Sequence, residues 1–548
     1  MQTSADAGAA QPSSRLAEGI ARGAVVVAGL TIVSRILGLA RTLVFSQTVG
    51  AGCLGTAYVT ANQVPDLLYQ LILGGALTSA MVPVLARSAE RVGQYPMEKA
   101  RVGQITSALL TWTVVIVVPL VVLIVVAAGP IASLLNPSNP NAHCAHADVV
   151  AVTAGMLRVF APQALLYGLS VVLYGLLQSY RRFAALSIAP AISSLVLITC
   201  YLLFVPLNNG RSLAQLPLPA ELVLSVGTTV GIAALVVVAL PSTWRLHLRL
   251  RPELRFPPGV ARRAGGLALV GVIELVAIDV ANVVAIILAN GHGKTGAVVL
   301  LNYGSQVFNS IAAILALSIV VSAFPVLSAR EGPDFDRTSA GSTRAVLLMS
   351  CLGTAIIAAI AIPAAHVLAR LPDQVPQLTE AFLLLAPGIA AAAVIANLSR
   401  VMFVIGQLKI AAVALAGSWL IVIAADLVLV PLVPARLVVA ALALGTTTGQ
   451  IVVAIPLVIV TRGICGRAAV QGVGRALLAG LAACAAGSAV GAGISLAVPL
   501  HHKLAAFVLA IFAAGCAIVA YGVVVFLLDD GDFKTVLAWL RRTARLRG

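Results

Sequence analysis

Long apolar segments follow one another along nearly the whole chain, separated by short polar stretches. Fourteen of them hold about 20 or more residues, which is enough for a helix to cross a bilayer. The predicted spans are 23–47, 56–86, 103–134, 148–178, 184–206, 219–241, 264–290, 295–328, 345–369, 376–399, 410–432, 437–461, 476–498 and 504–528. The runs are too long, and alternate too little, for the strands of a membrane β-barrel. The pattern therefore predicts an all-α polytopic membrane protein with about 14 transmembrane helices.

The composition excludes a large soluble protein, including a soluble enzyme with one apolar domain. Of the 548 residues, 60% are hydrophobic and 10% are charged, and the mean hydropathy is +1.05. Soluble domains carry about 25% charged residues. The net charge of +16 would favour nucleic acid as a partner in a soluble chain. Basic patches interleaved with aromatic residues are absent, so we expect no nucleic-acid partner.

The positive charges follow the predicted topology. If the N-terminus is cytoplasmic, the inner segments hold 27 Lys and Arg residues and the outer loops hold 5. Cytoplasmic loops of membrane proteins carry such an excess of positive charge. The division supports the number of spans and predicts that both termini are cytoplasmic.

The basic linker 242–263 divides the chain near its middle. We predict an N-lobe at 23–241 with spans 1 to 6, a C-lobe at 264–461 with spans 7 to 12, and two further helices within 462–528. A short repeat supports two lobes: "MVPVLARSAE" closes the second span and "AFPVLSAREG" closes the eighth. Both spans run in the same direction, so the lobes would be related by a pseudo-two-fold axis along the membrane normal.

The two ends of the chain differ from the spans. Residues 1–22 are small and polar and lack the apolar core of a signal peptide, so we expect a disordered cytoplasmic tail. Residues 529–548 are basic and amphipathic, which is typical of a segment that lies on the anionic inner leaflet.

Motifs for covalent chemistry are missing. The chain has no P-loop, no GxSxG and no HExxH, so we expect a transporter and not an enzyme. The seven cysteines show no metal-binding spacing. Cys144 has His143 and His146 as neighbours, which leaves a metal site as an alternative to a plain external loop, the interpretation that we favour.

Two arginines in the first span are the strongest candidates for a binding site. Charged groups inside a membrane usually face a protein interior or a water-filled cavity. Arg35 and Arg41 lie about 120° and about 9 Å apart on an ideal helix, and Gly38 between them could bend it. Guanidinium groups suit a diphosphate because they donate paired hydrogen bonds. The alternative for Arg35 is that its side chain extends to the inner membrane interface.

Other ionisable residues fall into two sets. Asp66 could pair with a first-span arginine, and Arg158 favours a structural role or a place at the cavity rim. Acidic groups with amide and hydroxyl neighbours in spans 7, 11 and 12 could bind Na⁺ or H⁺. These candidates are Glu274, Asp279, Asn282, Asp426 and Thr446. The alternative is that buried carboxyls only join helices by hydrogen bonds.

The segments "SRILGLARTLVFSQTVGAG", "TAYVTANQVPDLL" and "GGALTSAMVPVLA" resemble the opening of the MurJ/MviN family. Weaker similarities at "LQSYRRFAALSIAPA", "LNYGSQVFNS" and "ADLVLVPLV" extend over spans 1 to 12. The family consists of lipid II flippases of the MATE-like (MOP) exporter superfamily. The resemblance implies two lobes around a central cavity, a bacterial plasma membrane location, and cavity cations at Arg35 and Arg41.

The same resemblance implies further site residues. We expect the cavity to be lined by Asn62, Asp66, Tyr69, Gln70, Arg158 and Gln306. Tyr69 and Gln70 replace an arginine pair of the family, and Gln306 replaces the arginine of span 8. Thr42 and Thr56 stand where acidic residues are common. Such departures are similar to those of actinobacterial-type members.

The sequence-based hypothesis is that the chain flips lipid II from the inner to the outer leaflet by alternating access. The resemblance implies that the membrane potential or a cation gradient, of Na⁺ or H⁺, would drive it. Its partners would be membrane lipids and cell-wall synthesis proteins. One alternative is a flippase or exporter of another polyprenyl-linked oligosaccharide or of an amphipathic drug. Another is a non-transporting scaffold of the cell-wall synthesis machinery.

Overall fold

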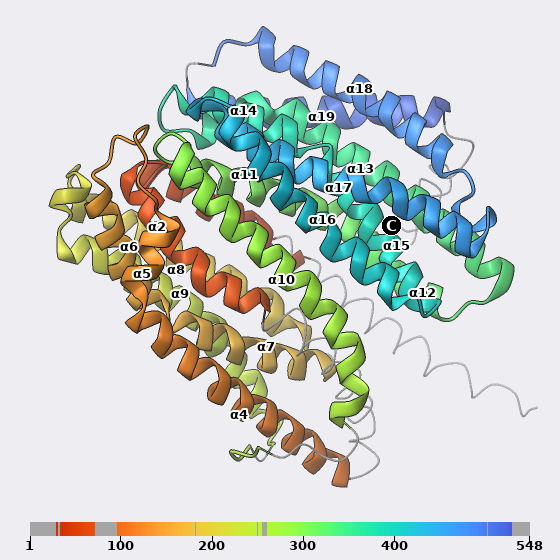
Figure 1. The fold of residues 1–548 in the computed structure, drawn as a ribbon, viewed down its shortest axis with the longest axis horizontal. Helices are drawn as coiled ribbons and strands as arrows, with labels where there is room; N and C mark the ends of the chain where they lie inside the picture. The colour runs from red at the N-terminus through yellow and green to blue at the C-terminus, as the bar shows by residue number, and fades with distance from the viewer. Residues whose placement is uncertain are drawn as a thin grey trace, which may run out of the picture. The chain divides into compact units, whose positions relative to one another are not determined.

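The computed structural model is helical throughout the part of the chain that it describes, residues 29–30, 33–71, 96–180, 182–248, 250–254, 260–500 and 502–528 (Figure 1). Twelve helices in that part are long and apolar enough to cross a membrane. Each coincides with one of the predicted spans, from the third to the fourteenth. The all-α prediction is confirmed. The first two predicted spans lie partly outside the described residues, so the total of fourteen is approximate.

The described residues form two compact units that interleave along the chain. Unit 1 contains those within Met1–Thr48, Ala76–Val126 and Arg158–Gly266, and unit 2 contains those within Val49–Gly75, Ala127–Leu157 and Leu267–Gly548. These boundaries differ from those of the predicted lobes, because contacts in space, and not sequence order, define a unit. The two lobes with their pseudo-two-fold axis stay a prediction.

Unit 1 is built from a helix over 33–48 and four labelled helices. These are α4 (Pro96–Val126), α7 (Gln163–Ser179), α8 (Phe183–Asn208) and α9 (Leu218–Trp244), with a 3₁₀ turn η2 at Leu213–Gln215. The rings of Phe45 and Tyr201 meet edge to face, with centroids 5.2 Å apart, and join the first helix to α8. Buried aliphatic side chains such as Val102, Leu176 and Leu177 form a core between α4 and α7.

Part of the predicted basic linker packs against α4. The backbone N–H of Arg251 donates to Ser107 Oγ at 3.0 Å, and that of Glu253 donates to Thr111 Oγ1 at 3.1 Å. Trp112 Nε1 donates to the carbonyl of Leu254 at 3.0 Å. These contacts tie backbone groups of the linker to polar side chains in the middle of α4.

Unit 2 holds the remaining helices. They are α2 (Cys53–Leu71), α5 (Ala128–Leu135), α6 (His146–Phe160), α10 (Val260–His292), α11 (Ala297–Ala312), α12 (Ser318–Ser328), α13 (Gly332–Leu368), α14 (Gln374–Leu385), α15 (Gly388–Val404), α16 (Leu408–Leu429), α17 (Val438–Cys465), α18 (Val473–Ala497) and α19 (Lys503–Leu528). Short turns lie at Ala313–Leu317 (η3), Val430–Leu432 (η4), Ala435–Leu437 (η5) and Ala468–Val470 (η6). Helices α6 and α10 continue from one unit into the other.

The predicted span 295–328 is one continuous helix with a local irregularity. Helices α11 and α12 are joined by η3, a π-helical turn, and together cover Ala297–Ser328. Such turns insert one extra residue into a helix without ending it.

Small residues let helices of unit 2 approach closely. Cβ atoms added at Gly480, Gly487 or Gly491 of α18 would press on Cys351, Ala355 or Ala359 of α13, which are spaced four residues apart. Small residues at this spacing are typical of helix pairs in membranes, where apolar burial gives little driving force and close packing must supply it.

Loops that the topology places on the same side of the membrane meet at the same end of unit 2. Among the predicted outer loops, Gln374 Nε2 donates to the carbonyl of Ala51 at 2.8 Å, and the N–H of His143 donates to Thr295 Oγ1 at 3.0 Å. Among the predicted inner segments, Arg344 Nη1 donates to the carbonyl of Gln471 at 2.7 Å. These contacts therefore agree with the predicted alternation of inner and outer loops in this unit.

Three predictions lie outside the described residues. They are the disordered tail at 1–22, the basic amphipathic tail at 529–548, and the copy of the repeat that contains Pro83. The second copy is described, with Pro325 inside α12.

Candidate functional site

Arg35 and Arg41 lie in unit 1, on the helix over 33–48. The side chain of Arg35 is exposed and that of Arg41 is half-buried. The helix continues through Gly38, and Thr42 Oγ1 donates to the Gly38 carbonyl at 3.2 Å, one turn before it. The helix is therefore not broken at Gly38, and the bend considered there stays a prediction. A regular helix keeps the two guanidiniums on different faces, since six residues rotate the chain by about 600°.

Four of the predicted cavity residues lie on α2, in unit 2. Gln70 Nε2 donates to Asp66 Oδ2 at 3.3 Å, one turn apart on the same helix. The carboxyl of Asp66 also interacts electrostatically with Tyr69 on its own helix and with Asp279 of α10. Asn62 Oδ1 is buried without a hydrogen-bond partner among the described residues. Asp66 therefore interacts with two side chains of its own helix and with Asp279 of α10, whose like charge it opposes.

Glu274 of α10 interacts electrostatically with Arg400 of α15, within unit 2. Arg400 is half-buried, and its Nη1 is buried without a hydrogen-bond partner in the described part of the chain. Sequence reasoning missed Arg400 because hydropathy ended the tenth span at residue 399, whereas α15 continues to Val404. The signal was present, since basic residues are common near the end of a helix and a glycine, here Gly406, often stands just past it.

Asp426 of α16 is the most buried carboxyl of the candidate set, with 1% of its surface exposed. Its Oδ1 has no hydrogen-bond partner in the region that the structure covers. The carboxyl lies against Gly445 of α17, where a Cβ atom would overlap Asp426 Oδ1. The neighbouring threonine hydroxyls donate to backbone carbonyls. Thr446 Oγ1 donates to the carbonyl of Leu442 at 3.0 Å, and Thr447 Oγ1 donates to the carbonyl of Leu384 at 2.5 Å.

The three acidic residues of the predicted cation site therefore each have a different neighbour. Asp279 faces Asp66, Glu274 faces Arg400, and Asp426 faces the backbone of Gly445. Within the described residues, no group of three or more His, Cys, Asp or Glu side chains has the arrangement of a metal site. Glu274 and Asp279 are five residues apart on α10, so an ideal helix separates their directions by about 140°. That separation explains why they reach different partners.

The remaining predicted residues are placed as follows. Arg158 lies in the last turn of α6 and is exposed, and Gln306 of α11 is exposed as well. Asn282 of α10 is half-buried.

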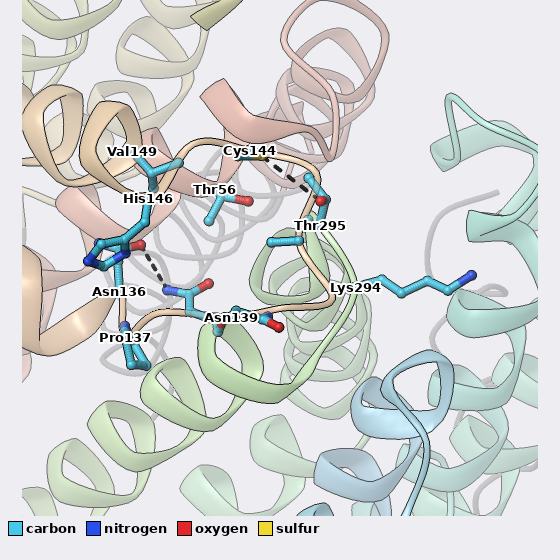
Figure 2. Close-up of a pocket in the computed structure, with 12 residues that line it drawn as sticks. Thr56, Asn136, Pro137, Asn139, Cys144, His146, Val149, Lys294 and Thr295 are labelled. Carbon is cyan, nitrogen blue, oxygen red and sulfur yellow. Dashed lines mark hydrogen bonds between the residues drawn. The ribbon is translucent and has the colours of Figure 1, made fainter. Parts of the chain in front are cut away.

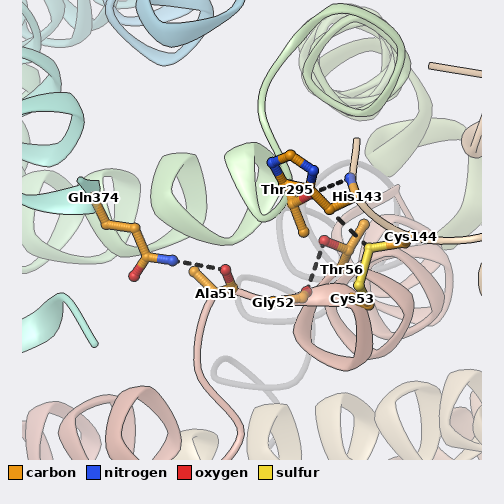
Figure 3. Close-up of a disulfide and its surroundings, with 8 residues drawn as sticks. All are labelled: Ala51, Gly52, Cys53, Thr56, His143, Cys144, Thr295 and Gln374. Atoms are coloured by element: carbon orange, nitrogen blue, oxygen red, sulfur yellow. Dashed lines mark hydrogen bonds between the residues drawn. A yellow bond between two sulfur atoms is a disulfide. The ribbon is translucent and has the colours of Figure 1, made fainter. Parts of the chain in front are cut away.

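A disulfide links the start of α2 to the loop before α6. Cys53 and Cys144 are bonded, with α-carbons 5.8 Å apart, although the two residues are separated by 91 positions in sequence (Figure 3). The metal site considered for Cys144 with His143 and His146 is therefore wrong, because a bonded sulfur has no thiolate to offer. Both cysteines stand in predicted outer loops, and this shared side was a signal that the sequence already contained. We call this part of unit 2 the disulfide end.

Hydrogen bonds continue the connection around the disulfide. Asn290 Nδ2 of α10 lies 3.0 Å from Thr60 Oγ1, 2.9 Å from the Leu135 carbonyl and 3.3 Å from Asn136 Oδ1, and donates to these acceptors. Asn139 Nδ2 donates to the carbonyls of Asn290 and Gly293, both at 2.7 Å. A cavity of about 50 Å³ remains between these side chains, enough for a few waters (Figure 2). Lys294 borders it but points away from the other labelled residues.

The turn before α11 fits against the turn before α2. Gly296 has φ +86°, which favours glycine, and a Cβ atom there would overlap the carbonyl of Ala51. That same carbonyl accepts the hydrogen bond from Gln374 (Figure 3). The disulfide end therefore ties four chain segments into one hydrogen-bonded structure.

Known proteins with similar sequences belong to one family. The profile of the family described as "Lipid II flippase MurJ" matches residues 45–513. A "Probable lipid II flippase MurJ" from Rhizobium tropici is 26% identical over 314 residues, which are 56% of this chain and 54% of that protein. The "Lipid II flippase MurJ" of Burkholderia cenocepacia is 27% identical over 313 residues, 56% of this chain and 57% of that protein. The chain thus matches about half the length of these curated relatives.

Solved structures with the same fold cover more of the chain. A structure described as lipid II flippase MurJ in an inward closed conformation superposes with a TM-score of 0.68, at 15% identity, over 91% of this chain and 98% of that one. An inward-facing multidrug resistance MATE transporter of the MOP superfamily gives a TM-score of 0.57, at 13% identity, over 82% and 99%. At these identities the likeness concerns the fold. The profile match extends over most of the chain, and the chain therefore belongs to the family described as "Lipid II flippase MurJ".

Proposed function

We propose that this protein flips lipid II from the inner to the outer leaflet of the bacterial plasma membrane. The observation that carries the proposal is the family profile match over residues 45–513. The fold supports it, because a lipid II flippase structure covers 91% of the chain. The relatives matched over about half their length are also named as lipid II flippases.

Arg35 and Arg41 would bind the diphosphate of the lipid. Both carry guanidinium groups on a helix that the sequence predicts to cross the membrane, and guanidinium groups suit a diphosphate because they donate paired hydrogen bonds. They precede the segment that the family profile matches, which begins at residue 45. The proposal for these two residues therefore rests on their motif and on the cost of placing a charge in a membrane.

Asp426 would bind the coupling ion, Na⁺ or H⁺. Its carboxyl is buried, and its Oδ1 has no hydrogen-bond partner in the described part of the chain, so it has an oxygen available for a cation or a proton. Lobes that rock against each other would expose the headgroup site alternately to the two sides.

The orientation that we propose has both termini in the cytoplasm. The Cys53–Cys144 disulfide supports it, since disulfides persist in oxidising compartments and both cysteines fall in predicted outer loops. Cell-wall synthesis proteins at the outer face would be natural partners, because they consume the flipped lipid.

Complementation tests the proposal. The full chain is expressed in a bacterium whose own lipid II flippase is depleted, and growth and cell-wall synthesis are measured. Rescue, together with lipid II flipping by the purified protein in liposomes, is the expected result. If the protein transports another polyprenyl-linked sugar and does not rescue growth, that lipid-linked sugar is the substrate and lipid II is not. Binding of cell-wall enzymes without any flipping would indicate a scaffold instead.

A further inference from the structure

A second cavity, of about 400 Å³, opens at the disulfide end of unit 2. It is lined by the end of α13, by the turn and first residues of α14, and by the turn between α18 and α19. Its volume is within the range of small-ligand sites and is well above that of the water-sized cavity next to the disulfide.

Basic side chains gather around this cavity. His366, Arg370, His502 and Lys503 all line it. Arg370 and Lys503 come from segments that are 133 positions apart in sequence, yet their charges lie close enough to act on each other. Because like charges repel, such a grouping favours an anion that both cations can share.

The turn that presents Arg370 is held in place before any ligand arrives. The buried side chain of Gln374 accepts the backbone N–H groups of Arg370 and Leu371 on its Oε1, at 3.2 and 3.3 Å. Its Nε2 donates to the carbonyl of Ala51, which joins the turn to the disulfide end. A binding group held in this way loses little freedom when it engages a ligand.

The rest of the lining and the rim are apolar. Leu371 and Leu500 line the cavity beside the cations, and Leu371 keeps 52% of its surface exposed. Leu504, one residue after Lys503, is 75% exposed. The cavity also lies where two membrane-length helices end or begin, α13 at Leu368 and α19 at Lys503. Basic groups bordered by lipid-facing leucines at helix ends match the level of the lipid headgroups.

We propose that this cavity binds the phosphate of an anionic phospholipid, with Arg370 and Lys503 on the phosphate oxygens and Leu371 against the glycerol and upper acyl chain. The positive end of α19, which begins at Lys503, adds to the attraction. The site differs from the proposed diphosphate residues Arg35 and Arg41, so it does not depend on whether the chain flips lipid II.

Native mass spectrometry tests the proposal on the full-length protein. The protein is purified in a mild detergent, titrated with phosphatidylglycerol or with phosphatidylcholine, and the bound lipids are counted. We expect one phosphatidylglycerol that resists removal, and no phosphatidylcholine at the same concentration. In the variant Arg370→Gln/Lys503→Gln the affinity should fall about 25-fold, at about fivefold per charge. Lys503→Arg should keep the affinity.

The variant Arg211→Gln/Arg436→Gln is the matched control, because it removes two exposed cations of predicted outer loops that do not line the cavity. Loss of phosphatidylglycerol in the cavity variant alone supports the proposal. Equal retention in both variants overturns it. If millimolar inorganic phosphate stabilises the wild-type protein and no phosphatidylglycerol is retained, the cavity binds free phosphate. That result overturns the proposal of a lipid site. Retention of lipid II at this position in place of phosphatidylglycerol also overturns it. Unchanged thermal unfolding of the cavity variant shows that it is folded.

Discussion

The carboxyl of Asp426 on α16 fills the space that the missing side chain of Gly445 leaves on α17. A Cβ atom at Gly445 would overlap Asp426 Oδ1 and come within 3.0 Å of its Cγ. The two helices can therefore approach only because residue 445 is a glycine. This places a buried acidic group directly on a helix backbone, and it makes the pair a target for mutation.

Gly445→Ala is expected to destabilise the protein by about 1–3 kcal/mol, because it overpacks the α16–α17 contact and displaces the carboxyl of Asp426. Thermal unfolding in detergent measures the effect. Gly463→Ala on the same helix is the matched control, since nothing lies within 4 Å of its added Cβ. Equal stability of the two variants would contradict the close contact. If Asp426 binds the coupling ion, Gly445→Ala should also lower transport more than Gly463→Ala does.

Removal of the Cys53–Cys144 disulfide should loosen the disulfide end of unit 2. Disulfides typically contribute about 2–4 kcal/mol, so Cys53→Ser/Cys144→Ser should lower the unfolding temperature by several degrees. Addition of a reductant should lower the unfolding temperature of the wild-type protein to the same value. Cys200→Ser is the control, because Cys200 is a free cysteine. Peptide mapping without reductant that finds Cys53 and Cys144 as separate thiols would show that the bond does not form.

The Glu274–Arg400 interaction predicts a coupled pair. Glu274→Gln or Arg400→Gln alone leaves one partly buried charge without its counterion, and each should cost about 1–2 kcal/mol. The double variant should cost less than the sum of the two, as in other directly interacting pairs. The free energy of unfolding is measured in mixed micelles for the wild type, the two single variants and the double variant, which together form a double-mutant cycle.

The exposed pair Asp334 and Arg337 serves as the control cycle. Arg337 Nη1 and Asp334 Oδ1 are 3.3 Å apart, but the Arg337 side chain is 79% exposed and that of Asp334 is 67% exposed, so the coupling should be near zero. If the losses of stability caused by Glu274→Gln and Arg400→Gln simply add in the double variant, the two charges act separately.

Arg41→Ala is expected to abolish rescue of a flippase-depleted strain while the protein still inserts, because a half-buried cation proposed for the diphosphate is lost. Membrane fractionation and immunoblotting measure insertion. Arg41→Lys should retain partial function, since it keeps the charge and loses the paired donors. Arg211→Ala, at an exposed residue of a predicted outer loop, is the control. Normal growth of the Arg41→Ala strain would remove Arg41 from the binding site.

Much of the fold could be read from the sequence. In a membrane every backbone polar group must be satisfied within its own segment, so long apolar runs become helices whatever their neighbours are. The twelve described spans therefore coincide with the predicted ones, including the long span that contains a π-helical turn. The family resemblance rested on local motifs of the first spans, and the profile match confirmed it.

The candidate site was less predictable, because it depends on the direction in which each side chain points. The sequence grouped Glu274, Asp279 and Asp426 as one acidic set, yet each has a different neighbour in the structure. Arg400 was assigned to a loop because hydropathy locates the end of an apolar run and not the end of a helix.

By itself, the sequence determined that the chain is a multi-pass helical membrane protein, where the long apolar helices of its described part lie, and which family it belongs to. These properties follow from hydropathy, loop charge and local motifs, all of which act over short stretches of chain. Only the tertiary structure decided that Cys53 bonds with Cys144, that Asp426 lies against Gly445, and that Arg370 and Lys503 share a cavity. Each of these pairs joins residues from different segments, and their meeting depends on how helices pack, which no local pattern contains.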